Sequence, residues 1–325
     1  MKHMLKVAAW TVSGVISLWY IIQAVIVEKR SVGSKLAEDI IKVFNFDLAE
    51  VDEEMLEKNM EHNRKEYILR DGVMRSDVTA FQDSGMKVFR VSPAEKKSTR
   101  RVLYLHGGGY VHQPSYFHWL FIDKMVRDTG LEFIVPIYPK APEYTYRDAY
   151  KKVAALYQDL LKESDEELIF MGDSAGGGLA VGFTQWLASE NMAMPKAVII
   201  ISPWLDITLE NPEMAEYAKV DPMLEPYNLK IIGRIWTGDS SPDNYKVSPI
   251  QGELKGLPKI YIFVGTREIC LPDTRKFVSL LEEAEAPHEY HEYPMMNHVF
   301  PQYPILEGAR ARREIIEILE KVEEE

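Results

Sequence analysis

The chain has 325 residues, of which 46% are hydrophobic, and it carries a formal net charge of −12 at pH 7. This length and apolar content exclude a disordered chain and allow a sizeable core in one large domain or two smaller ones. The single cysteine excludes a disulfide scaffold, a cysteine-based zinc cluster and an iron–sulfur centre, and the acidity argues against nucleic acid as a partner because phosphates attract basic surfaces.

The first predicted element is an apolar helix close to the N-terminus. Val7–Val27 holds no charged residue across 21 positions, and a helix of that length spans roughly 30 Å, the hydrocarbon thickness of a bilayer. We therefore predict a single-pass membrane anchor in residues 1–30 and one folded domain in residues 31–325. Positive charges flank the segment on both sides in similar number, so they do not indicate which side of the membrane the domain occupies.

Two alternatives for this segment stay open. A cleaved signal peptide has an apolar region of about 7–15 residues and a small-x-small cleavage site, whereas this run is longer and ends in Val25-Ile26-Val27-Glu28. A buried core helix carries a polar face, but the polar residues of the segment are few and scattered: Thr11, Ser13, Ser17 and Gln23. The membrane anchor is the interpretation that these patterns favour.

The rest of the chain alternates between short apolar strands and longer helices. Ser31–Leu69 is helical in character, and a turn signal at Asp83-Ser84-Gly85 then separates the first two strands. The predicted strands are Val78–Gln82, Lys87–Val91, Val102–Leu105, Phe133–Ile137, Leu168–Met171, Val198–Ile201, Ile260–Val264 and Glu289–Tyr293. The predicted helices are Tyr116–Asp128, Glu143–Glu163, Ala175–Glu190, Thr274–Glu285 and Ile305–Glu320. This order predicts an α/β fold whose mostly parallel sheet of about eight strands has helices on both faces and an antiparallel hairpin at its start.

One interval breaks the alternation. Trp204–Pro249 contains no convincing strand and one predicted helix around Tyr227–Trp236. Insertions above the carboxyl ends of a sheet often cover a site. We therefore predict a helical cap formed by residues 31–75 and 204–249.

A candidate nucleophile lies in Gly172-Asp173-Ser174-Ala175-Gly176, a G-x-S-x-G sequence. The predicted strand Leu168–Met171 precedes it and a predicted helix follows, which is the strand–turn–helix context of a nucleophile elbow. A serine on so sharp a turn crowds the residues two before and two after it, which favours glycine there. The helix that begins behind Ser174 directs its positive dipole end at the site.

A glycine-rich loop, His106-Gly107-Gly108-Gly109, follows the predicted strand Val102–Leu105. Glycines let backbone N–H groups approach a substrate closely, and such donors stabilise a tetrahedral oxyanion. A phosphate-binding loop is a poor alternative, because the Lys-Ser/Thr of a P-loop is missing.

Together these motifs resemble the hormone-sensitive lipase family of α/β-hydrolases. Further segments are similar to landmarks of that family: Tyr138-Pro139-Lys140-Ala141-Pro142-Glu143, Ser202-Pro203-Trp204-Leu205-Asp206, Asp221-Pro222-Met223-Leu224 and Val247-Ser248-Pro249-Ile250. The resemblance covers roughly Val78 to the C-terminus. It implies an α/β-hydrolase fold and ester hydrolysis, with an oxyanion hole formed by the N–H groups of Gly108, Gly109 and Ala175.

A nucleophilic serine needs a base, and the base needs an orienting acid. In this fold the acid and then the histidine follow the serine along the chain. His298 lies on the loop after the last predicted strand, where the family places its base. Glu268, just past the strand Ile260–Val264, is the favoured acid, although the family usually has aspartate at that position. Asp273, in the first turn of the next predicted helix, is the alternative.

These patterns predict a carboxylic ester hydrolase that acts on short- to medium-chain acyl esters through an acyl-enzyme, with no cofactor and no metal. An amidase, a deacetylase of a sugar or cell-envelope acyl group, or a non-catalytic binding protein on the same fold are the alternatives, because a fold does not determine a function. The predicted partners are a small acyl ester and, through residues 1–30, a membrane. No pattern indicates an oligomeric state.

Overall fold

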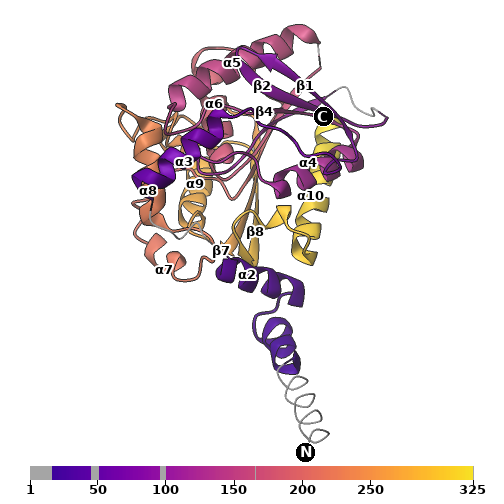
Figure 1. Ribbon diagram of the computed structural model, residues 1–325, viewed down its shortest axis with the longest axis vertical. Coiled ribbons are helices and arrows are strands. Elements are labelled where there is room, and N and C mark those ends of the chain that lie inside the picture. The colour runs from indigo at the N-terminus through magenta and orange to yellow at the C-terminus, as the bar shows by residue number, and fades with distance from the viewer. Residues whose placement is uncertain (1–16, 45–50, 96–99, 165, 325) are drawn as a thin grey trace, which may run out of the picture.

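A central sheet of eight strands organises the chain, in a computed structural model that describes residues 17–44, 51–95, 100–164 and 166–324. The strand order is β1-β2-β4-β3-β5-β6-β7-β8 (Figure 1). The strands are β1 (Asp77–Asp83), β2 (Met86–Ser92), β3 (Arg101–Leu105), β4 (Glu132–Pro136), β5 (Leu168–Asp173), β6 (Ala197–Ile201), β7 (Lys259–Arg267) and β8 (His288–Asn297). Pairing is antiparallel for β1–β2 and β2–β4 and parallel in every other pair. The predicted mostly parallel sheet with an initial hairpin is confirmed.

Two apolar layers cover the two faces of the sheet. In β3, Leu103 and Leu105 face one cluster while Val102 and Tyr104 face the other, because successive side chains of a strand point to opposite sides. The first layer is completed by α5 (Tyr146–Glu163), α6 (Ala175–Ser189) and α9 (Leu271–Glu283). The second is completed by α4 (Tyr116–Thr129) and α10 (Leu306–Glu324). The buried sheet explains why its central strands are apolar throughout.

Local capping decides where the helices begin and end. The α5 helix begins at Tyr146, later than the predicted Glu143, because Thr145 and Asp148 form a capping box. Ser115 and His118 cap α4 in the same way. The last residue of α4 is Thr129, and Gly130, whose φ of 71° suits a left-handed C-cap, follows it.

The interval between β6 and β7 is helical, as predicted, and its described residues form no strand. It contains α7 (Met214–Ala218), α8 (Pro226–Thr237) and the short η3 (Pro249–Gln251). The α3 helix (Glu53–Arg64) lies close to α8 (Figure 1), and the Val51 N–H donates to Asn228 Oδ1 at 3.1 Å.

The N-terminal part projects from the body of the molecule (Figure 1). Residues 17–22 are helical and continue into the π-helix η1 (Gln23–Val27), and α2 (Val32–Phe44) then packs on α10. The predicted anchor falls partly on residues 1–16, which lie outside the described residues. Within the described ranges, no helix combines the length and the apolar character needed to cross a bilayer.

Candidate active site

Ser174 occupies a sharp turn between β5 and α6. Its φ of 52° and ψ of −123° are uncommon for a residue with a side chain, and such strain is often found at functional positions. A Cβ on Gly172 would lie 2.5 Å from the Gly176 carbonyl oxygen, and a Cβ on Gly176 would lie 2.0 Å from the Leu105 oxygen. Glycine is therefore required on both sides of the serine, as the elbow motif predicts.

Three side chains from three different elements meet at this turn. His298 Nε2 lies 2.9 Å from Ser174 Oγ, and His298 Nδ1 lies 2.7 Å from Glu268 Oε2. Glu268 follows β7 and His298 follows β8, and neighbouring parallel strands end at the same edge of the sheet. The structure thus brings the three predicted catalytic side chains into one hydrogen-bonded chain.

The second oxygen of Glu268 is also held. Glu268 Oε1 accepts from Ser202 Oγ at 2.8 Å and from the Gly265 N–H at 2.7 Å. The Ser202 hydroxyl oxygen in turn accepts from the Val299 N–H at 3.0 Å, next to His298. The sequence indicates Ser202 only as part of the segment Ser202-Pro203-Trp204-Leu205-Asp206, and its contact with the carboxylate is visible only in the folded chain.

Asp273, the alternative acid, points elsewhere. Its Oδ1 accepts from Asn211 Nδ2 at 2.9 Å in the first turn of α9. Burial raises the pKa of Asp273 from 3.8 to about 6. Of the two carboxylates, the one that contacts His298 is that of Glu268.

The charges around His298 favour its protonated form. Burial by itself lowers the pKa of His298, but the adjacent Glu268 carboxylate outweighs burial and raises this pKa above 6.5, with smaller contributions from Asp221 and Asp173. Asp221 accepts the N–H groups of Met223, at 2.8 Å, and Ile269, at 2.9 Å, and burial raises its own pKa to about 6. An imidazole with this surrounding is suited to take a proton from a hydroxyl group.

The glycine loop and the start of α6 present unused donors beside Ser174. Gly108 and Gly109 have positive φ values of 114° and 60°, which turn the chain there. In the described chain the N–H groups of Gly108, Gly109 and Ala175 have no protein acceptor, whereas the Gly107 N–H donates to Asp173 Oδ1. These three N–H groups are free to bind an oxyanion.

Asp173 holds the glycine loop in place. Besides the Gly107 N–H, it accepts from Tyr104 Oη at 2.6 Å and contacts His118 Nε2 at 3.1 Å. Burial by itself raises the pKa of Asp173, but His118 and the hydrogen bonds outweigh it and lower this pKa to about 2. His118 precedes Ser174 in the chain, so the expected order of serine, acid and histidine does not indicate it.

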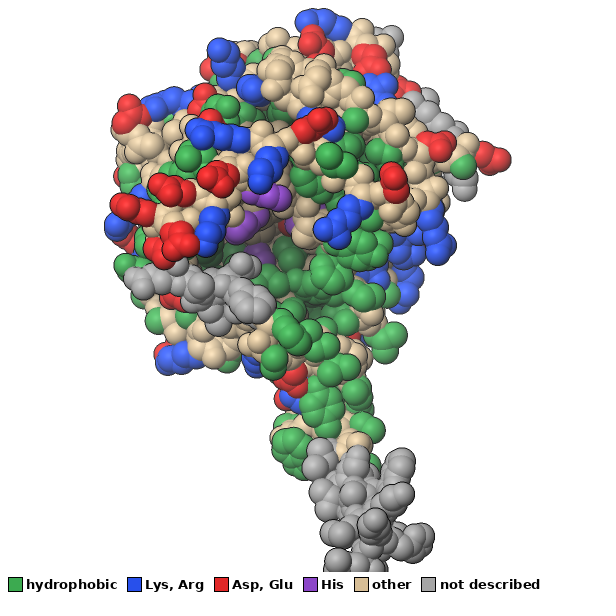
Figure 2. Space-filling view, in the orientation of Figure 1, with side chains coloured by type: hydrophobic (Ala, Val, Ile, Leu, Met, Phe, Trp, Pro, Cys, Tyr) green, Lys and Arg blue, Asp and Glu red, His purple; other side chains and the backbone are tan. Residues whose placement is uncertain are grey.

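A cavity of about 500 Å³ opens onto Ser174, the glycine loop and His298. Its wall is mainly apolar. It includes residues of α3, of the segment just before α3, of α8 and of the segment between α7 and α8: Val51, Met55, Leu224, Leu229 and Ile232. Figure 2 shows histidine side chains inside a hollow on this face, with apolar surface beside them. The hollow is therefore suited to an apolar substrate group that must reach a nucleophile.

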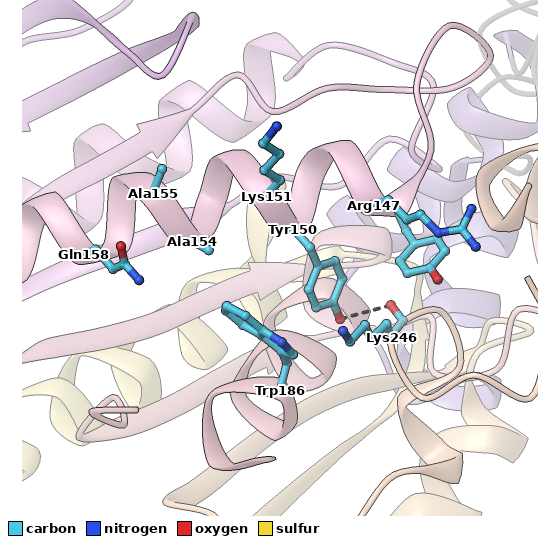
Figure 3. Close-up of a pocket in the computed structure, with 9 residues that line it drawn as sticks. Arg147, Tyr150, Lys151, Ala154, Ala155, Gln158, Trp186 and Lys246 are labelled. Carbon is cyan, nitrogen blue, oxygen red and sulfur yellow. Dashed lines mark hydrogen bonds between the residues drawn. The ribbon is translucent and has the colours of Figure 1, made fainter. Parts of the chain in front are cut away.

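A second cavity, of about 530 Å³, lies against α5 and is shown in Figure 3. Tyr150, Trp186 and Lys246 form its inner wall, and Tyr150 Oη donates to the Lys246 carbonyl oxygen at 3.0 Å. No serine or histidine is among its described lining residues. It therefore offers no nucleophile–base pair.

One group of potential metal ligands occurs among the described residues, formed by Glu268, Cys270 and His298. The carboxylate and the imidazole already bind one another, and burial raises the pKa of Cys270 well above 9.0. A thiol ligand must lose its proton, so this group is poorly suited to hold a metal.

Comparison with known proteins agrees with this geometry. A protein of Acinetobacter venetianus named esterase is 30% identical over 213 residues, which are 65% of this chain and 70% of that protein. An acetyl-hydrolase of Streptomyces hygroscopicus is 31% identical over 68% of this chain and 75% of its own length. The solved structure of an esterase/lipase from an uncultured bacterium is similar with a TM-score of 0.79 and 26% identity, over 89% of this chain and 98% of that one. EstE7, a homologue of hormone-sensitive lipase from a metagenome library, is similar with a TM-score of 0.76 and 25% identity, over 89% and 98%.

The sheet, the elbow and the site define a serine ester hydrolase. The family model of the alpha/beta hydrolase fold matches residues 102–302, more than half of the chain, and the chain belongs to that family. The predicted resemblance to hormone-sensitive lipase and the predicted class of carboxylic ester hydrolase are both confirmed.

Proposed function

We propose that Ser174 is the nucleophile of this hydrolase, that His298 is its general base and that Glu268 orients the base. The observation that carries this proposal is the continuous hydrogen-bonded chain from Glu268 through His298 to Ser174, with distances of 2.7 and 2.9 Å, at the wall of an apolar cavity. In the reaction, His298 removes the Ser174 hydroxyl proton as the oxygen attacks the ester carbonyl carbon.

The tetrahedral oxyanion then accepts hydrogen bonds from the N–H groups of Gly108, Gly109 and Ala175. One such donor contributes about 3 kcal/mol of transition-state stabilisation. His298 passes its proton to the leaving alcohol, and the acyl group stays on Ser174. Water activated by His298 releases the acid, and Glu268 stabilises the imidazolium in both steps.

The substrate we propose is an ester with a short- to medium-chain acyl group. A cavity of about 500 Å³ with a mostly apolar wall accepts such a group. The cap that selects it comprises residues 31–75 and 204–249, and the contribution of α3 and α8 to the cavity wall supports this assignment.

We also propose that residues 1–30 attach the enzyme to a membrane. The uncharged run Val7–Val27 supports this, as do the exposed apolar side chains of its described part, which include Leu18, Trp19 and Ile26. Exposed apolar surface of this kind is unfavourable in water and favourable in lipid.

Substitution of the nucleophile tests the mechanism. Ser174→Ala should lower the hydrolysis of a p-nitrophenyl butyrate ester by about 10⁴-fold or more and abolish labelling by a fluorophosphonate probe. Ser279→Ala is the control, because Ser279 is an exposed serine of α9 that is not among the described residues lining the cavity. Retained turnover in Ser174→Ala would overturn the assignment.

A substrate panel separates this proposal from the alternatives. Esters of increasing acyl length, matched anilides and acetylated sugars should give the highest kcat/KM with the short- to medium-chain esters. Faster cleavage of the anilides or acetylated sugars would make the enzyme an amidase or a deacetylase. Absence of turnover and of probe labelling would indicate a binding protein.

A further inference from the structure

We propose that the outer face of α2 lies in the headgroup layer of a lipid bilayer and holds the mouth of the substrate cavity at the lipid surface. The substrates of the enzyme would then be lipophilic esters that are dissolved in the membrane. The substrate part of this inference rests on the proposed ester hydrolysis and membrane attachment.

The α2 helix carries apolar residues on two sides. Ala37 and Ile41 pack against the core of the domain, and a second apolar face points outward. The fully buried residues of the helix are polar, Ser34 and Glu38, and Glu38 is only 1% exposed. Apart from Lys42, its large exposed residues are apolar, and they recur at the spacing of one helical face: Leu36, Ile40, Val43 and Phe44. A surface helix normally buries its apolar stripe, so this helix directs its outward stripe at something outside the domain.

The polar side of α2 is firmly held, so the helix cannot simply turn over. Glu38 pairs with Arg30, with Arg267 at 2.9 Å and with Lys42 at 2.5 Å. At the start of the helix, the Ser31 N–H donates to Glu307 of α10 at 2.6 Å. Rotation of α2 would separate the buried Glu38 carboxylate from Arg30 and Arg267, which lie outside the helix, and this is strongly unfavourable. The outward direction of the apolar face is therefore a property of the fold.

A bilayer is the occupant that the chain itself places next to this face. The apolar run Val7–Val27 ends five residues before α2 begins at Val32. Any membrane that holds this run lies within reach of Leu36 and Ile40. An interfacial helix with a large apolar face binds at the headgroup–acyl boundary. Because the protein is acidic overall, with a net charge of −12, apolar burial is the attractive force and anionic lipid is not required.

The apolar surface continues from α2 to the mouth of the cavity. Leu306, which is 74% exposed, precedes Glu307, and Tyr303 nearby in the chain lines the cavity. The Tyr303 ring is largely buried and lies 5.3 Å from the ring of Phe117, a wall residue that is exposed. Figure 2 shows this as an apolar band that runs from the histidine-lined hollow down to the N-terminal helix. A lipid surface at α2 would therefore border the opening through which substrate enters.

Fluorescence quenching tests the docking of α2. An environment-sensitive fluorophore is attached to the cysteine of full-length Ile40→Cys. The protein is then added to phosphatidylcholine vesicles that contain a lipid with a nitroxide on its headgroup. The matched control is Lys162→Cys, an exposed position of α5, which lies at the other end of the molecule in Figure 1. The native Cys270 is buried. We expect quenching of the label at position 40 and none at position 162. The same result in the Ser174→Ala background would show that docking is independent of hydrolysis.

Each other outcome overturns a distinct statement. A chain that floats with vesicles but shows no quenching at position 40 overturns the docking of α2 and leaves the anchor intact. Self-quenching at position 40 that depends on the protein-to-lipid ratio, without nitroxide quenching, shows that a second copy covers the face. A chain that does not float overturns both the anchor and the docking, while hydrolysis of a water-soluble ester still reports on the catalytic assignment.

Kinetics test the consequence for substrate. The double variant Leu36→Gln/Ile40→Gln should lose several-fold in kcat/KM on a medium-chain ester of a lipophilic alcohol carried in phosphatidylcholine vesicles. It should keep its activity on water-soluble p-nitrophenyl acetate. Tyr144→Gln, which changes an exposed aromatic residue outside α2 and outside the cap, should leave both activities unchanged. Equal losses on the two esters, or no loss on the vesicle substrate, would refute delivery from the lipid surface.

Discussion

Glu268 is the residue whose role depends most on its surroundings. One carboxylate oxygen faces His298, and the other accepts from Ser202 and from the Gly265 N–H. Glutamate is one methylene longer than the aspartate that the family usually has there, and these two further donors hold the longer side chain in one position. Asp273 lacks any contact with the histidine and interacts with Asn211 instead.

Replacement of each of the two acids by its amide should affect kcat differently. Glu268→Gln should lower kcat by about 10³- to 10⁴-fold, because the imidazolium loses its counter-charge. Asp273→Asn should keep a near-native kcat when both variants are assayed with p-nitrophenyl butyrate. The reverse pattern of rates would move the role of the acid to Asp273.

Asp273→Asn should also change stability in a pH-dependent way. The folded pKa of Asp273, about 6, lies above its ordinary 3.8, so the ionised form destabilises the fold as pH rises through this interval. The amide removes that penalty, which amounts to up to about 3 kcal/mol. Thermal unfolding should show a higher Tm than wild type at pH 8 and an equal Tm at pH 4. A Tm equal to that of wild type at both pH values would argue against a raised pKa of Asp273.

The raised pKa of His298 predicts the pH dependence of catalysis. The base must be neutral, so kcat/KM should rise with pH through the pKa of His298 and then reach a plateau. Because the Glu268 carboxylate is the main group that raises this pKa, the acidic limb of residual Glu268→Gln activity should move to lower pH. An unmoved limb would mean that another group controls it.

At the scale of elements, the site depends on the close approach of three chain segments. The start of α6 touches the end of β3 where Gly176 meets the Leu105 carbonyl oxygen. Ser174 N–H donates to the Ile201 oxygen at the end of β6 at 2.8 Å. The elbow is therefore supported by both neighbouring strands, which keeps the serine in its unusual backbone conformation.

Gly176→Ala should disrupt this packing. The new Cβ would lie 2.0 Å from the Leu105 oxygen, so backbone must move, and we expect a loss of about 3 kcal/mol or more of unfolding free energy. Gly33→Ala, in α2, is the control because its Cβ would meet nothing closer than Ser31 Oγ at 3.8 Å. Chemical denaturation of both variants measures the difference, and similar midpoints would contradict the close approach.

At the scale of the whole molecule, the residues that form the site and the N-terminal segment belong to separate parts of the chain. The sheet and its catalytic loops lie between β1 and the end of α10, whereas η1 contributes one buried side chain, Ala24. Attachment to a membrane and chemistry at Ser174 are therefore expected to respond to different changes in the chain.

Deletion of residues 1–27 should separate these two properties. The shortened chain keeps Arg30 and its pairing with Glu38, so it should fold and hydrolyse p-nitrophenyl acetate at a rate close to that of the full chain. The full chain should resist alkaline extraction from membranes, and the shortened chain should be released by it. Release of the full chain under these conditions would contradict an integral anchor.

The sequence by itself determined the alternation of strands and helices, the glycine-lined elbow at Ser174 and the order of serine, acid and histidine. These features are local: burial on both faces produces apolar strands, and a strained turn requires glycine at Gly172 and Gly176. Only the tertiary structure shows that Glu268 contacts His298 while Asp273 contacts Asn211. It also shows the contacts of Ser202 and His118 at the site and the outward direction of the apolar face of α2. Those outcomes depend on which segments meet in space. Glu268 and Asp273 are only five positions apart, yet they contact different partners at the start of α9. Periodicity alone likewise does not indicate which face of a helix the domain covers.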